Sequence, residues 1–119
     1  MEETQQDGDL PQFDVTKAII GGFYDVYNQL GRGFLESVYE RSLAIALSEA
    51  GLNVQEQFPV TVYFRNCPVG HFKADLLIND SVLVELKVAR RLHSRHRAQL
   101  INILKATSLE VGLLVTFWT

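Results

Sequence analysis

The stretch LLINDSVLVELK, residues 76–87, decides the fold, because it reads as two apolar strands joined by a short polar turn. A two-residue turn would place Asp75 opposite Val84 and would send Asp75 and Glu85 to opposite faces of the sheet. A three-residue loop over residues 79–81, or an equivalent one-residue bulge, would instead place Asp75 opposite Glu85.

We predict the three-residue loop, because it separates the side chains of both strands into two consistent faces. One face is wholly apolar and should pack against helices: Ala74, Leu76, Ile78, Val82, Val84, Leu86 and Val88. The other face carries the charges: Asp75, Leu77, Leu83, Glu85 and Lys87. Asn79 and Asp80 also tolerate the left-handed backbone that such a loop often needs.

Hydrophobic spacing outside this hairpin predicts the remaining elements. The expected helices are Phe13 to Leu30, Phe34 to Ala50 and His93 to Thr107, and the buried stripe of the second comprises Leu35, Val38, Leu43, Ala46 and Leu47. The expected strands are Val54 to Phe58, Val60 to Phe64, Val69 to Ile78, Val82 to Val88 and Val111 to Phe117. We summarise the order as ααββββαβ, an α/β fold in which helices flank a mixed sheet.

Length and composition indicate one ordinary globular domain. The chain has 119 residues, 47% of them hydrophobic, and no apolar run approaches the roughly 20 residues of a membrane span. We expect residues 1–12 to form a flexible acidic arm and residues 13–119 a single domain. The single cysteine, Cys67, excludes an internal disulfide, and the N-terminus lacks a signal-peptide pattern, so a cytoplasmic protein is expected.

Basic residues are concentrated just after the hairpin. Arg90, Arg91, Arg95 and Arg97 follow Lys87 within a short segment that also contains two histidines. Two interpretations remain open: a solvated helix surface, or a face that binds the phosphates of a nucleic acid.

The pair of charges at Glu85 and Lys87 also has two interpretations. Alternation along an edge strand could place both side chains in solvent. Alternatively, a carboxylate pair of Asp75 and Glu85 could hold a hard divalent ion such as Mg²⁺, and Lys87 could position water or offset charge on a phosphate.

The sequence GFLESVY, Gly33 to Tyr39, resembles the G-x-x-E-x-x-Y signature of the GxxExxY proteins, small domains grouped with the PD-(D/E)XK, RecB-like nucleases. The resemblance extends through KADLLI at Lys73 to Ile78, VELK at Val84 to Lys87, AQL at Ala98 to Leu100 and GLLVTF at Gly112 to Phe117. It implies a restriction-endonuclease-like core and hydrolysis of phosphodiester bonds with Mg²⁺ or Mn²⁺.

The resemblance also implies roles for individual residues. Asp75, Glu85 and the backbone carbonyl of Leu86 would hold the metal, and Lys87 would be the catalytic lysine. Glu36 matches a helix carboxylate that supports the metal or its water.

Two further positions correspond to residues on helices. Gln99 matches a helix glutamine of RecB-like members. Tyr39 would orient Glu36 or touch the nucleic acid, or it packs its helix with the hydroxyl at the edge. The sequence departs from the family pattern at Ile103, where an aromatic is expected, and in the terminal TFWT from Thr116.

The resemblance implies a nuclease that acts on nucleic acid, with DNA as the first choice of substrate. A domain of this size has little surface for sequence-specific reading, so a homodimer or a partner protein would supply recognition. Two alternatives from other classes stay open: a module that binds nucleic acid without cleaving it, and a protein-interaction domain that retains the nuclease fold.

Overall fold

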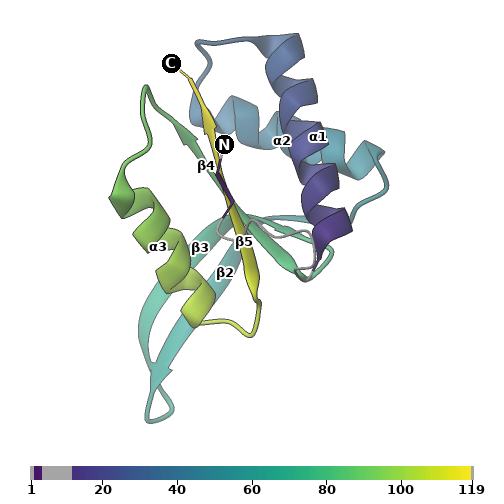
Figure 1. Ribbon diagram of the computed structural model, residues 1–119. Coiled ribbons are helices and arrows are strands. Elements are labelled where there is room, and N and C mark those ends of the chain that lie inside the picture. The colour runs from purple at the N-terminus through teal and green to yellow at the C-terminus, as the bar shows by residue number, and fades with distance from the viewer. Residues whose placement is uncertain (1, 4–11, 119) are drawn as a thin grey trace.

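The computed structural model describes residues 2–3 and 12–118 of the chain. Within them, helices pack on both sides of one sheet (Figure 1). Their bounds are β1 Glu2–Glu3, α1 Phe13–Leu30, α2 Glu36–Glu49, β2 Val54–Phe64, β3 Cys67–Ile78, β4 Val82–Val88, α3 Ser94–Lys105 and β5 Val111–Phe117.

The sheet has the strand order β1-β5-β4-β3-β2, in which β4 and β5 are parallel and the other neighbours antiparallel. Helix α3 connects the two parallel strands and covers one face of the sheet, while α1 and α2 lie on the other side (Figure 1). The mixed sheet between helices confirms the predicted α/β class and the restriction-endonuclease-like arrangement.

The two short strands predicted over residues 54–58 and 60–64 run into one another as β2. Pro59 lies between them and pairs with Lys73 of β3. Because β2 is the last strand of the sheet, a residue without a backbone N–H can be accommodated there without breaking an interior ladder. Of the predicted N-terminal arm, Glu2–Glu3 form β1 and residues 4–11 lie outside the described ranges.

The register of the β3–β4 hairpin confirms the three-residue loop. Ile78 pairs with Val82, and the next pairs continue the same register to Leu76 and Val84. Asn79 and Asp80 have positive φ angles of 51° and 53°, the left-handed conformation that their short polar side chains tolerate. The N–H of Ser81 closes the loop by donating to the carbonyl of Ile78 at 3.0 Å.

Most side chains of the hairpin lie on the predicted faces. The apolar set packs in one cluster with α1 and α2: Leu76, Ile78, Val82, Val84 and Leu86, with Val88 partly buried against it. On the other face, Leu77 and Leu83 are buried in a cluster with Leu100 and Ile103 of α3, so the face that carries Glu85 is itself partly covered by a helix.

The prediction for Ala74 is wrong, because this residue is buried in the cluster on the α3 side. The ladder between β2 and β3 is interrupted next to this residue. Gln57 has a φ of 52° and has no ladder partner between the pairs Glu56–Leu76 and Phe58–Ala74, and Asp75 opposite it has none either. Simple alternation therefore does not carry the apolar face past Asp75.

Helix α2 begins at Glu36, two residues after its predicted start. Two members of its predicted stripe are on the surface, since Leu35 is 76% exposed and Val38 is 36% exposed. Leu43 and Leu47 of the predicted stripe are buried, together with Tyr39 and Ala44, and Ala46 is partly buried. Within the described ranges, no helix is both long enough and apolar enough to cross a membrane.

Candidate active site

Asp75 and Glu85 lie side by side where β3 separates from β4. Oε1 of Glu85 accepts the N–H of Asp75 at 3.1 Å, and Oδ2 of Asp75 accepts the N–H of Leu86 at 2.7 Å. Glu85 is only 4% exposed and Asp75 is half-buried. The three-residue loop has therefore placed two carboxylates together, each held by a backbone N–H of the opposite strand.

The electrostatic environment of Glu85 disfavours its ionised form. The pKa of Glu85 is raised to about 7, chiefly by burial and in addition by the neighbouring charge of Asp75. The N–H of Asp75 and the ammonium of Lys87 lower this pKa in part, while Glu36 raises it. Among the described residues no cation lies within ion-pair distance of Glu85, so the pair is an acidic centre that favours a positive ligand.

Glu36 extends from the first residue of α2 toward the end of β4. Its Oε1 accepts the N–H of Val88 at 3.3 Å, and its charge acts on the carboxyl of Glu85. Helix α2 and strand β4 thereby bring Glu36 and Lys87 to the same region as the acidic pair. Four of the five proposed catalytic side chains, those of Glu36, Asp75, Glu85 and Lys87, therefore lie in one region, although they come from three separate elements.

Sequence reasoning missed two residues of this site. The side-chain amide of Gln57 donates to both oxygens of Glu40, at 3.0 and 2.9 Å, and to Oδ1 of Asp75 at 3.4 Å. Burial raises the pKa of Glu40, the amide of Gln57 lowers it and the charge of Asp75 raises it. Glu40 could have been found, because it follows Glu36 by one helical turn. Gln57 could not, since its position depends on an irregular backbone.

A second group lies around Lys87 on the α3 side of the sheet. Partial burial lowers the pKa of His96, and the charges of Lys87, Arg95 and His93 lower it further. Thr116 pairs with Lys87 in the ladder between β4 and β5. Within the part of the chain that the structure describes, His96 Nδ1 and Thr116 Oγ1 are buried without a hydrogen-bond partner.

The side chain of Tyr39 lies in the core, and its contact with a nucleic acid remains a prediction. Its side chain is fully buried and stacks on Phe117 with ring centroids 4.1 Å apart. The hydroxyl donates to the carbonyl of Gly31 and accepts the N–H of Phe34. The alternative interpretation of Tyr39, an aromatic that packs its helix, is the one that the structure shows.

Gln99 lies on the exposed surface of α3, one turn after His96. Among the described residues, no hydrogen bond joins its side chain to Asp75, Glu85 or Lys87. Its catalytic role remains a prediction.

The donor set suits a hard divalent ion. No three side chains of Asp, Glu, His or Cys within the described ranges are grouped closely enough to form a complete cage. Mg²⁺ does not require one, because it is usually bound through one or two carboxylates and keeps several waters. Asp75, Glu85 and the backbone carbonyl of Leu86 therefore fit such an ion by the chemistry of their oxygen atoms.

The predicted basic segment leads directly from β4 into α3. Arg90, Arg91, Arg95 and Arg97 are all exposed. A cavity of about 250 Å³ at the start of α3 is lined by Leu92, His93, Ser94 and Arg97. The first turn of α3 contains no acidic residue, so its N-terminal N–H groups add to the positive field.

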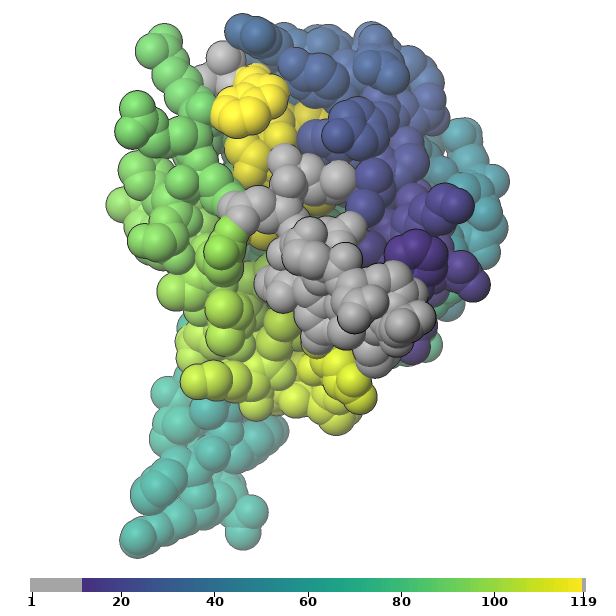
Figure 2. Space-filling model, viewed as in Figure 1, coloured from purple at the N-terminus to yellow at the C-terminus, as the bar shows by residue number. Residues whose placement is uncertain are grey.

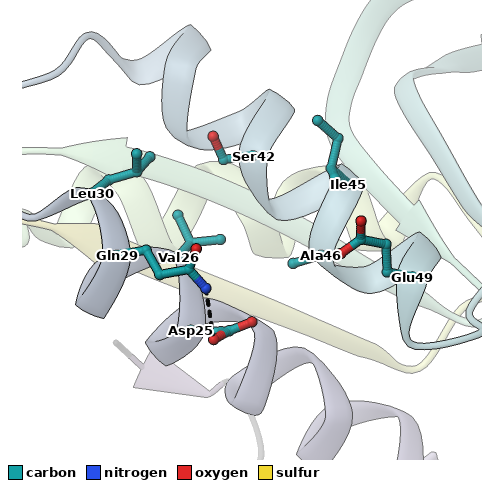
Figure 3. A pocket seen from close by; sticks show the side chains of 8 residues that line it. All are labelled: Asp25, Val26, Gln29, Leu30, Ser42, Ile45, Ala46 and Glu49. Atoms are coloured by element: carbon teal, nitrogen blue, oxygen red, sulfur yellow. Dashed lines mark hydrogen bonds between the residues drawn. The ribbon is translucent and has the colours of Figure 1, made fainter.

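A separate cavity of about 180 Å³ lies between α1 and α2 (Figure 3). Its polar residues include Asp25, Ser42 and Glu49, and Gln29 donates to Asp25 at 3.1 Å (Figure 3). It shares no residue with the group around Asp75 and Glu85, and none of its lining residues is basic.

Comparison with known proteins supplies one match. Residues 13–119 match the family described as the PD-(D/E)XK nuclease superfamily. No curated protein and no solved structure matches the chain.

Proposed function

Because the chain belongs to the PD-(D/E)XK nuclease superfamily, we propose that it hydrolyses phosphodiester bonds in DNA with Mg²⁺ or Mn²⁺. The observation that carries this proposal is the buried pair of Asp75 and Glu85 beside Lys87. Buried carboxylates without a cation are costly, and a site of this kind is retained where it binds an ion or a substrate.

We also propose the finer assignment to the GxxExxY proteins. Its support is the motif of Gly33, Glu36 and Tyr39, in which each residue has a distinct place. Gly33 has a φ of 103°, which favours glycine, Glu36 reaches the end of β4, and Tyr39 anchors α2 in the core.

Asp75, Glu85 and the carbonyl of Leu86 would hold the metal, and Glu36 would support it from α2. When bound, Mg²⁺ or Mn²⁺ supplies a Lewis acid that stabilises negative charge on the phosphoryl and departing oxygens. The chain itself fixes the two carboxylates through the N–H groups of Asp75 and Leu86. The bridge from Gln57 to Glu40 limits the rotation of Asp75.

Lys87 lies close enough to Glu85 to lower its pKa, so its ammonium is within reach of the same reacting group. In our proposal it orients the attacking water or offsets charge that develops on the phosphate. Gln99 and the arginines at 90, 91, 95 and 97 would contact the phosphates that flank the cleaved bond.

A cleavage assay on single-stranded, duplex and branched DNA, with and without Mg²⁺ or Mn²⁺, tests the proposal. We expect Glu85→Gln and Lys87→Ala each to lower the rate by about a hundredfold or more. Glu49→Gln, on the far side of α2, is the matched control and should leave the rate unchanged. Cleavage that persists in Glu85→Gln and Lys87→Ala, or in EDTA, would contradict the assignment.

The same assay separates the main alternative, a module that binds nucleic acid without cleaving it. One observation favours this alternative: no three acidic, histidine or cysteine side chains in the described part of the chain form a ready metal cage. Binding that is retained, with no cleavage of any substrate under either ion, is its expected result.

Recognition of a particular DNA structure would require more surface than this domain offers. We propose that a second copy of the chain or a partner protein supplies it. Mass measured in solution, with and without a DNA oligonucleotide, tests the homodimer.

A further inference from the structure

The hairpin formed by β2 and β3 extends well beyond the body of the protein. Figures 1 and 2 show it as an arm that projects past α3, and the molecule measures 47 × 29 × 24 Å. We call residues 60–73 the hairpin arm and residues 62–70 its tip. At roughly 3.3 Å per residue, the run from Asn66 to Asp75 spans about 30 Å, so the arm connects its tip directly to the acidic pair.

The tip carries large apolar side chains in solvent. Tyr63 is 65% exposed, Phe64 is 59% exposed and Val69 is 62% exposed. The guanidinium of Arg65 lies 4.9 Å from the centre of the Phe64 ring. Two exposed aromatic side chains and one arginine thus follow one another in sequence at the end of the hairpin, where they contribute to neither core cluster.

The arm is free of negative charge. The sequence contains no Asp or Glu from Gln57 to Ala74, whereas it contains Arg65, His71 and Lys73. The chain as a whole has a formal net charge of -3, so this local excess of positive charge runs against the average. A polyanion is the ligand that such a surface complements.

The edge of the sheet is protected against pairing with another protein strand. Pro59 lies in the middle of the edge strand β2, and Gln57 forms an irregularity just before it. Both devices discourage strand addition. The ligand of the arm is therefore expected at the exposed side chains of the tip rather than along its backbone.

We propose that the hairpin arm binds single-stranded nucleic acid, with bases stacked on Tyr63 and Phe64 at its tip and phosphates held by Arg65 at the tip and by Lys73 nearer the body of the protein. Stacking on aromatic side chains requires unpaired bases, and a groove of basic and aromatic residues is how proteins bind single strands without sequence preference. The inference deepens the proposed function, because it assigns the substrate an unpaired segment. That segment would lie up to about nine nucleotides from the cleaved bond, at a rise of roughly 3.4 Å each.

Binding of a labelled oligothymidine and of a blunt duplex, both measured in EDTA so that no cleavage occurs, tests the proposal. We expect the wild-type protein to prefer the oligothymidine. Tyr63→Ala with Phe64→Ala should weaken its binding about 30-fold, as expected for the loss of two stacked bases, and should affect the duplex less. Tyr63→Phe, which retains the ring, should keep the affinity.

Phe13→Ala with Tyr24→Ala is the matched control, because it removes two comparably exposed aromatic side chains from α1. This variant should bind as the wild type does. Arg65→Ala should also flatten the dependence of binding on salt, by about 0.7 in the logarithmic slope for one lost phosphate contact. Circular dichroism melting of each variant establishes that it is folded.

Three results with the Tyr63→Ala, Phe64→Ala variant would overturn the proposal. The first is an unchanged affinity for oligothymidine, and the second is an equal loss of affinity for oligothymidine and duplex. The third is a change in the mass of the protein in solution without a change in its binding of oligothymidine. The last would assign the tip to a protein interface. Failure of the proposed function appears separately, as absent cleavage under Mg²⁺ and Mn²⁺ with a tip that still binds. If the wild-type protein cleaves DNA and the tip variant binds oligothymidine with unchanged affinity, the inference about the tip is refuted and the proposed nuclease function is not.

Discussion

Strand β3 has two halves of opposite character. The half that begins at Ala74 is buried, and at its start it holds a carboxylate, Asp75, among apolar residues. The half that lies in the arm is mostly exposed, and it leads to a tip where aromatic side chains meet solvent. The usual distribution is reversed in both, since a charge lies inside and rings lie outside. A buried charge and solvent-exposed aromatic rings do not contribute to folding. Such reversals are therefore expected at functional sites.

The difference in burial between the two halves of β3 predicts different effects of mutation. At the buried half, substitutions should change stability, pH dependence and metal binding together. At the tip, they should change binding of nucleic acid and leave stability nearly unaltered.

The largest expected effect compares two aromatic side chains. Tyr39 is fully buried and stacks on Phe117, so Tyr39→Ala should lower the free energy of unfolding by about 3 to 5 kcal/mol. Phe64→Ala at the tip should change it by less than about 1 kcal/mol. Urea denaturation followed by circular dichroism measures both. Equal losses in the two variants would remove the distinction between the buried half and the tip.

The next effect concerns Glu85 and pH. Its pKa of about 7 in the folded protein lies above the ordinary value of 4.5, so the folded state holds a proton that the unfolded state releases. The contribution of the Glu85 carboxyl to the free energy of unfolding is fully present below pH 4.5 and is lost as pH rises through 7. Glu85→Gln should therefore be more stable than the wild type at pH 8, by up to about 3 kcal/mol, and nearly equal at pH 4.

Unfolding midpoints in urea across this pH range test the prediction for Glu85. Glu49→Gln, which removes a carboxylate from the surface of α2, should shift the curve little at any pH. A stabilisation by Glu85→Gln that does not depend on pH would show that burial of this carboxyl is not the cause.

The sequence was sufficient to predict the hairpin and its acidic pair. Only the register that places Ile78 opposite Val82 puts the apolar side chains of β3 and β4 on the same face of the sheet, so the alternation of side chains determines the loop length. The placement of Glu36 near Asp75 and Glu85 was inferred from the family resemblance. Sequence spacing could not predict it, because α2 and β4 are far apart along the chain.

The errors have physical causes in tertiary structure. Gln57 adopts a positive φ, which no residue pattern signals for glutamine, and its amide lies between Glu40 and Asp75. The ladder is interrupted at Gln57 and Asp75, and Ala74 beyond this point is buried on the α3 side. Tyr39 has an apolar ring and a polar hydroxyl, so its sequence context fits both a ligand contact and a buried aromatic. Only the stacking on Phe117 distinguishes them.

The central claim is that Asp75 and Glu85 together hold one divalent ion. Calorimetric titration with Mn²⁺ at pH 8, where Glu85 is ionised, tests it most directly. We predict one site in the wild type, an affinity at least about tenfold weaker in Glu85→Gln and in Asp75→Asn, and wild-type affinity in the control Glu49→Gln. Binding that is absent from the wild type, or equally strong in Glu85→Gln and Asp75→Asn, would contradict the account.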